Sequence, residues 1–100
     1  MPPPTGIPAG FELDPGRPNP SSDGTVIGFT LPVAADVHLE LFDVQGRSVR
    51  RLLDGRVEAG PRRITWDLRD AAGHRVAPGI YIYRMSAAGW VGRSKLVVLP

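Results

Sequence analysis

Apolar and polar residues alternate along most of the chain in short runs with a period of two. In the clearest run, Val37, Leu39 and Leu41 alternate with His38 and Glu40. Successive side chains of a β-strand point to opposite faces, so each run predicts a strand with one buried face. No segment shows the spacing of a long amphipathic helix. The pattern therefore predicts an all-β protein.

Turn-forming residues separate these runs at short intervals. Gly, Pro and Asp gather in residues 15–24 and again in residues 69–78, and such clusters interrupt regular structure. Short strands at this spacing are typical of an immunoglobulin-like (fibronectin III-like) antiparallel β-sandwich, for which we expect about seven strands. The expected strands cover residues 11–14, 25–31, 37–42, 63–68, 79–87 and 90–99, with one more following the turn at Gln45 and Gly46.

The alternation also predicts which side chains form the core and how the strands are placed. Trp66 is the largest inward residue and the expected anchor of the core. We expect Tyr81 to bond its hydroxyl back to upstream backbone, as in a tyrosine corner. Strands 25–31 and 37–42 should pair across the turn at Pro32, and the arginine-rich strand after Gly46 should be a sheet edge. The predicted inward residues are Thr25, Ile27, Phe29, Leu31, Val37, Leu39, Leu41, Ile64, Trp66, Leu68, Tyr81, Tyr83, Met85, Leu96 and Val98.

The first ten residues differ in composition from the rest. Residues 1–10 read MPPPTGIPAG and contain four prolines, which favour an extended arm. We therefore expect a Pro-rich linker or arm at 1–10 and one domain at 11–100. The arm lacks the pattern of a signal peptide, and no stretch of the chain approaches the roughly 20 apolar residues of a membrane span.

Composition and motifs argue against catalysis and against a cofactor. The net charge is only +2 and there is no cysteine, which makes nucleic-acid binding and thiolate metal sites poor interpretations. His38 and His74 have no second ligand at a metal-binding spacing. Asp67, Asp70 and Gly73 suit a turn better than a calcium loop, which needs an alternating acidic pattern. No nucleophile elbow or phosphate-binding loop is present, so we expect a non-enzyme.

Six arginines gather in the middle of the chain and allow two interpretations. The favoured one is a solvated sheet edge whose arginines pair with Asp54 and Glu58, because exposed charges are the usual protection of an edge. The other is contact with anionic lipopolysaccharide. The six are Arg47, Arg50, Arg51, Arg56, Arg62 and Arg63.

Four segments taken together resemble a known bacterial family. They read PNPSSDGTVIGFTLP, VHLELFDVQGRSVRRLLDG, AGPRRITWDLRDAAGHRVAPGIYIYRM and KLVVL. They are similar to the family shared by type IX (Por) secretion C-terminal sorting domains and the Ig-like domain of the flagellar hook-capping protein. The positions that carry the resemblance include Pro18, Asn19, Pro20, Gly46, Trp66, Asp67, Gly73, Gly79 and Tyr81.

The resemblance implies a non-catalytic sorting domain of a secreted or cell-surface protein in a Gram-negative-type bacterium. By resemblance, residues 92–99 would carry the signal that the secretion machinery reads, and a cell-surface sortase can then remove the domain and attach the passenger to lipopolysaccharide. The main alternative is an assembly module, either a hook-cap domain or an extracellular filament subunit, which binds neighbouring subunits. A carbohydrate-binding or adhesion module is a third possibility, but it needs a row of exposed aromatic side chains that the mostly inward aromatics make hard to build.

The last strand is apolar on both faces near its end, although only one face of a sandwich strand meets the core. We therefore predict a docking surface for a protein partner on the outward face of the last two strands. Two details remain open: the arm could instead cover this face through Ile7 and Phe11, and Trp90 could be a core edge or an interface residue. The predicted docking residues are Ile80, Ile82, Lys95, Val97 and Leu99.

Overall fold

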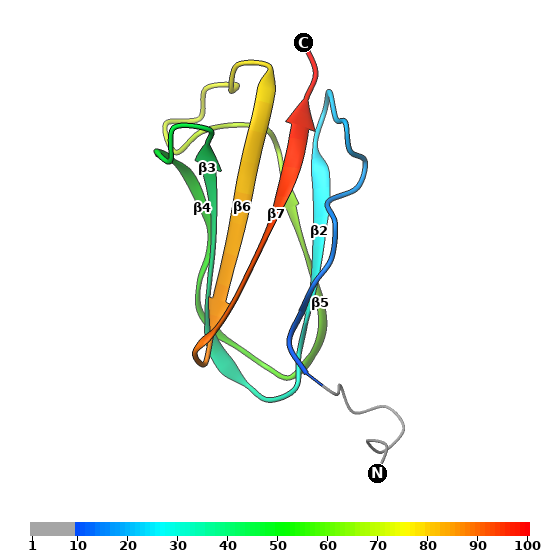
Figure 1. The fold of residues 1–100 in the computed structure, drawn as a ribbon, viewed down its shortest axis with the longest axis vertical. Helices are drawn as coiled ribbons and strands as arrows, with labels where there is room; N and C mark the ends of the chain where they lie inside the picture. Colours follow the sequence, from blue (N-terminus) through cyan, green and yellow to red (C-terminus); the bar gives the residue numbers. More distant parts are fainter. Residues whose placement is uncertain (1–9) are drawn as a thin grey trace.

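The computed structural model describes residues 10–100 and contains seven strands in two packed antiparallel sheets (Figure 1). The predicted immunoglobulin-like sandwich is therefore confirmed. Residues 10–100 contain no long apolar helix of the kind that crosses a membrane. One sheet has the order β1 (Glu12–Leu13), β2 (Thr25–Leu31), β5 (Gly60–Trp66), and the other has the order β4 (Ser48–Val57), β3 (Ala35–Asp43), β6 (Gly79–Ala87), β7 (Trp90–Val98).

The core lies between the two sheets and consists mainly of the residues that the alternation assigned inward, together with Ala35, Val76 and Ala87. Trp66 and Tyr83 are the two largest side chains that are fully buried, and β3 buries every second residue from Ala35 to Leu41. Ile64 is the exception among the predicted residues, because it is only half-buried against the core. Each large aliphatic side chain buried in this way contributes about 1.5–3 kcal/mol, so the period-two pattern provides the stability of the domain.

The predicted pairing of strands 25–31 and 37–42 is wrong. The β2 strand pairs with β1 and β5, whereas β3 pairs with β4 and β6 in the other sheet. Residues 32–34 thus connect the two layers instead of forming a hairpin. Both arrangements bury the same alternating residues, so the local sequence did not distinguish them.

The strand containing Trp66 also differs from its predicted bounds of 63–68. It begins at Gly60 and ends at Trp66, and Leu68 has a φ of 63°. That left-handed conformation takes the chain out of the sheet, while the side chain of Leu68 remains fully buried. The β4 strand lies at a sheet edge, as its arginines predicted.

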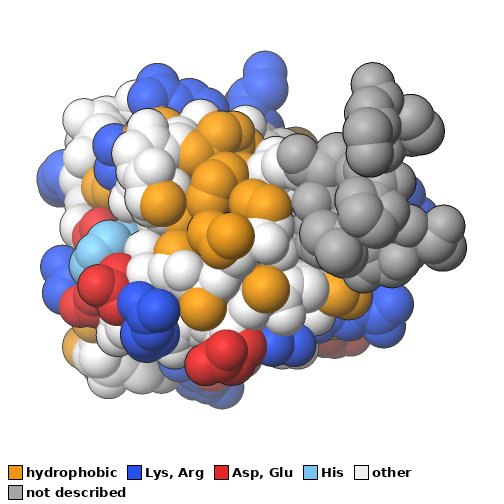
Figure 2. All heavy atoms as spheres, turned by 90° about the horizontal axis from the view of Figure 1, so that it is seen from below, with side chains coloured by type: hydrophobic (Ala, Val, Ile, Leu, Met, Phe, Trp, Pro, Cys, Tyr) orange, Lys and Arg blue, Asp and Glu red, His pale blue; other side chains and the backbone are white. Residues whose placement is uncertain are grey.

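The described part of the chain begins at one end of the sandwich, and the C-terminus lies at the other end (Figure 1). Phe11 stacks on Trp90 at the N-terminal end, with ring centroids 5.7 Å apart. Seen from this end, hydrophobic side chains gather near the middle of the surface (Figure 2). Trp90 is a half-buried residue at the edge of the core. Because Phe11 stacks on Trp90 at the start of β7, it does not cover Val97 near the other end of that strand. Ile7 lies outside the described residues.

Candidate docking site

The five predicted docking residues lie together at the end of the β6–β7 pair where β6 begins and β7 ends. Ile80 is opposite Val97, and Ile82 is opposite Lys95. The exposed fractions of Ile80, Val97 and Leu99 are 48%, 36% and 41%, whereas Ile82 is half-buried. Neighbouring outward aliphatics of this kind form an apolar patch on an otherwise polar surface.

The patch continues onto β3 and the turn after it, through residues that the sequence analysis did not single out. Phe42 is opposite Ile82, and a shallow groove of about 300 Å³ is lined by Phe42, Val44 and Ile82 together with Arg84 and Arg93. Phe42 follows inward Leu41 in the alternation, so the pattern already placed it outward. The docking face is thus three strands wide, and we define it as Phe42, Val44, Ile80, Ile82, Val97 and Leu99.

Positive charge borders the docking face. Arg84 and Arg93 are opposite each other on β6 and β7, and Lys95 is the next outward residue along β7. None of these three cations forms an ion pair with a carboxylate of the described residues. Like charges placed opposite one another on a sheet are destabilising. The face therefore combines apolar contact area with unmatched positive charge.

The Pro18-Asn19-Pro20 segment closes the backbone edge of β7 beside this face. The Asn19 side chain donates from Nδ2 to the Lys95 carbonyl at 3.2 Å and accepts at Oδ1 from the Val97 amide at 2.8 Å. The Ser21 amide donates to the Val97 carbonyl, and the Leu99 amide donates to the Ser21 carbonyl. The Asn19 carboxamide thus takes the place of a neighbouring strand, so Lys95 to Leu99 present a side-chain face but no free edge.

Further bonds hold this end of the sandwich in place. The Arg75 guanidinium donates to the Ser22 carbonyl at 2.5 Å and to the Leu99 carbonyl at 3.4 Å. The Tyr81 hydroxyl donates to the Ala77 carbonyl at 2.5 Å, which confirms the predicted tyrosine corner. Burial, with a smaller contribution from the Asp43 charge, raises the pKa of Tyr81, so its hydroxyl stays protonated and able to donate at neutral pH.

Two turns near this end share one design. The Asp43 carboxylate accepts from the amides two and four residues on, and Asp70 does the same. Gly46 and Gly73 provide the left-handed residue that each turn requires, with φ of 83° and 87°. The Arg47 amide contributes most to lowering the pKa of Asp43. Asp67 also serves a turn, because its Oδ1 accepts from the amide two residues on.

The six arginines do not form one patch. Three of them pair with carboxylates: Arg47 with Asp43, Arg50 with Asp67, and Arg51 with Asp54. Arg62 donates to backbone carbonyls in its own turn, and Arg63 lies on β5 in the other sheet. The predicted pairing with Asp54 is confirmed for Arg51, but the one with Glu58 is wrong, because Glu58 forms no ion pair with any described residue.

Replacing Asn19 by alanine tests its role at the β7 edge. The change removes two hydrogen bonds worth roughly 0.5–1.5 kcal/mol each, so we expect a loss of about 1–3 kcal/mol in the free energy of unfolding and faster hydrogen exchange at the Val97 amide. Denaturant melts and NMR exchange measure both. Ser22→Ala is a matched control, because the structure uses only the backbone carbonyl of Ser22. Unchanged exchange at Val97 would show that Asn19 does not close the edge.

The family comparison supports the assignment made from the sequence. The family model described as the FlgD Ig-like domain matches residues 18–89, from the Pro18-Asn19-Pro20 segment to the β6–β7 turn. The chain belongs to this family. A FlgD Ig-like domain is a structural domain. The match spans five of the seven strands, β2 to β6, and stops before β7.

Solved structures agree with this membership. FlgD from Pseudomonas aeruginosa is 28% identical, with a TM-score of 0.57 over 75% of this chain and 62% of that one. FlgD from Xanthomonas campestris, whose structure is described as giving insights into the hook capping essential for flagellar assembly, is 26% identical. Its TM-score is 0.59 over 91% of this chain and 63% of that one. Dimeric latent PorU from Porphyromonas gingivalis shares the fold at 24% identity, with a TM-score of 0.72 over 91% of this chain and 10% of that one. A search of curated proteins found no match.

Proposed function

We propose that this FlgD Ig-like domain is a sorting domain that directs an exported bacterial protein to the cell surface through type IX secretion machinery. The observation that carries the proposal is the docking face, which leaves apolar side chains of the last strand uncovered within the described part of the chain. A two-sheet core uses only Leu96 and Val98 from this end of β7, so Val97 and Leu99 are available for a partner.

The partner binds the side chains of this face and not the backbone edge. Asn19 and Ser21 already occupy the hydrogen-bonding groups of β7 from Lys95 to Leu99, which leaves no room there for an added strand. The partner surface therefore carries apolar groups opposite the patch and carboxylates opposite Arg84, Arg93 and Lys95. A protein of the secretion machinery with such a surface fits both features.

The sorting function is tested by fusing residues 10–100 to the C-terminus of a reporter that carries its own inner-membrane export signal. In a host with type IX secretion, we expect the fusion to reach the cell surface or the medium. The same reporter without the domain is the control and should stay in the periplasm. Periplasmic retention of a folded fusion would contradict the sorting function.

An assembly function is the second candidate, because both FlgD structures match this chain at 26–28% identity. In this case the same face would contact a neighbouring subunit of a hook or filament. Saturable binding of the purified domain to hook subunits, together with periplasmic retention of the reporter fusion, would favour assembly over sorting. The two measurements therefore separate the two candidates.

A further inference from the structure

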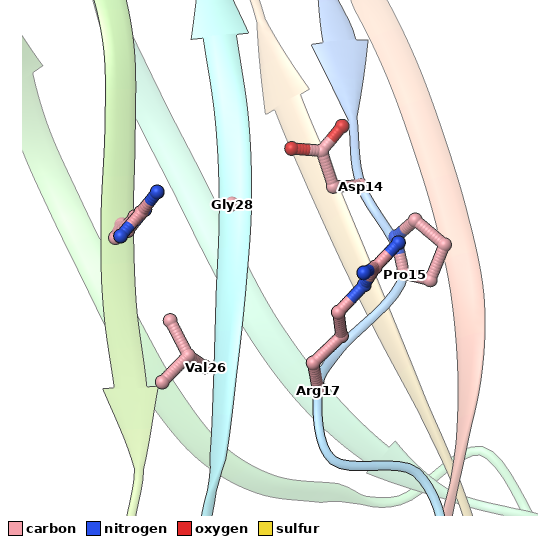
Figure 3. Close-up of a pocket in the computed structure, with 6 residues that line it drawn as sticks. Asp14, Pro15, Arg17, Val26 and Gly28 are labelled. Atoms are coloured by element: carbon pink, nitrogen blue, oxygen red, sulfur yellow. The ribbon is translucent and has the colours of Figure 1, made fainter.

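A second hollow lies on the opposite outer face of the sandwich, over the three-stranded sheet (Figure 3). It has a volume of about 610 Å³ and takes its walls from the chain after β1 and from two strands. The proposed docking function does not use it, since the docking face belongs to the other sheet. Its lining residues are Asp14, Pro15, Arg17, Val26, Gly28 and Arg63.

The floor of this groove is open because residue 28 is a glycine. A Cβ atom at Gly28 would lie 2.7 Å from the Asp14 carboxylate oxygen Oδ2, closer than nonbonded atoms allow. The Asp14 carboxylate thus lies over the backbone of β2. Val26, two residues earlier on the same face, has an exposed fraction of 39%, so the floor also has an apolar part.

Backbone hydrogen bonds hold the walls in register. Arg17 and Val26 exchange two amide-to-carbonyl bonds of 2.9 and 2.7 Å. The Asp14 amide donates to the Gly28 carbonyl at 2.8 Å, and the Asp14 carbonyl accepts from the Tyr83 hydroxyl at 2.6 Å. Figure 3 shows the Arg17 side chain directed along the groove toward Asp14 and Pro15.

The charges of the groove are not matched within the described residues. Arg63 on β5 is the register partner of Gly28, so it approaches the floor from the side opposite Asp14. Neither Arg17 nor Arg63 forms an ion pair with any carboxylate between residues 10 and 100, and Asp14 forms none either. Two guanidinium groups and one carboxylate therefore leave the groove with one positive charge in excess.

We propose that this groove binds a small hydroxylated organic anion, such as a sugar acid or a sugar phosphate. The guanidinium groups of Arg17 and Arg63 donate to the carboxylate or phosphate oxygens, for which their planar forks are well suited. The Asp14 carboxylate accepts hydrogen bonds from the ligand hydroxyls. Val26 and Pro15 contact the C–H face of the ligand, so each lining side chain has a role.

NMR titration of residues 10–100 with four probes tests the proposal. Glucuronate and glucose 6-phosphate should give saturable shifts of the Val26, Gly28 and Arg63 amides with a dissociation constant in the millimolar range, below about 50 mM. Glucose lacks the anion and acetate lacks the hydroxyls. Each should therefore bind at least about tenfold more weakly than the two sugar anions, because losing a charge-assisted hydrogen bond weakens binding by about that factor. A stronger response to one of the two anions identifies the preferred anionic group.

Three variants complete the test, and all three replace exposed side chains. Arg17→Gln and Arg63→Gln should each weaken glucuronate binding about tenfold. Arg56→Gln, at an exposed position on β4 in the other sheet, is the matched control and should leave binding unchanged. The proposal is overturned if neither anion gives saturable shifts, if all three variants bind alike, or if acetate binds as tightly as glucuronate.

Discussion

Replacing Trp66 by alanine is expected to destabilise the domain by roughly 3–5 kcal/mol, the usual cost of emptying a large aromatic site. Trp66 is fully buried and packs edge-on against Tyr81, with ring centroids 5.6 Å apart. Its indole N–H also donates to the Arg69 carbonyl at 2.9 Å. The change therefore leaves a cavity and removes the shorter of the two hydrogen bonds that the Arg69 carbonyl accepts, since the other, from Arg50 Nη1, is 3.4 Å long. Because small domains are stable by only about 5–15 kcal/mol, this loss is a large share of the total stability of the domain.

Denaturant melts followed by circular dichroism measure this loss. Trp90→Ala is the matched control, because it removes the same side chain from a half-buried position at the edge of the core, and it should cost distinctly less. Trp66→Phe should cost less than Trp66→Ala, since it keeps an aromatic ring in the core and loses the indole hydrogen bond together with part of the packing. A loss below about 1 kcal/mol for Trp66→Ala would contradict its role as the core anchor.

Placing aspartate at both Val97 and Leu99 is expected to reduce export of the reporter fusion by about tenfold or more, because an unpaired carboxylate in an apolar interface costs more than the 1.4 kcal/mol that a tenfold change represents. Both side chains point away from the core and are more than one-third exposed. The folded state is thus expected to tolerate the changes. Surface fractionation and a quantitative blot measure the exported share.

Val91→Asp is the matched control for this double variant. Val91 lies on β7 and is 44% exposed, but it lies at the turn end of the strand, opposite Ser86. It should therefore export normally. Circular dichroism and thermal melts confirm that both variants are folded. Export of a folded Val97→Asp/Leu99→Asp variant at the normal level would show that the docking face is not the surface that the machinery reads.

The alternation of residue types determined the strands and their buried faces. Ile27 and Phe29 on β2, and Leu39 and Leu41 on β3, are buried as the period of two predicted. Each strand of a two-sheet sandwich has one face toward the core and one toward solvent, whichever strands it pairs with. Turn chemistry was equally local. Gly46 has the left-handed conformation that its turn requires, and a residue with a Cβ resists that conformation.

The sequence alone determined only part of the docking face. The excess of apolar residues at Val97 and Leu99 was visible in the sequence, and the structure places them beside Ile80 and Ile82. The contributions of Phe42 and Val44 to the same face depend on β3 lying next to β6. This pairing joins segments about 40 residues apart, and neither segment alone predicts it.

Tertiary structure alone decided how the strands are paired and what closes the last edge. A connection as short as residues 32–34 can form a hairpin or cross between sheets while burying the same side chains, and only the remote partners β5 and β6 select the crossing. Asn19 and Arg17 show the same principle, because nothing near them predicts that Asn19 pairs with β7 or that Arg17 shares a groove with Arg63. Side-chain periodicity is a property of one strand, whereas pairing and binding sites depend on the free energy of contacts between distant segments.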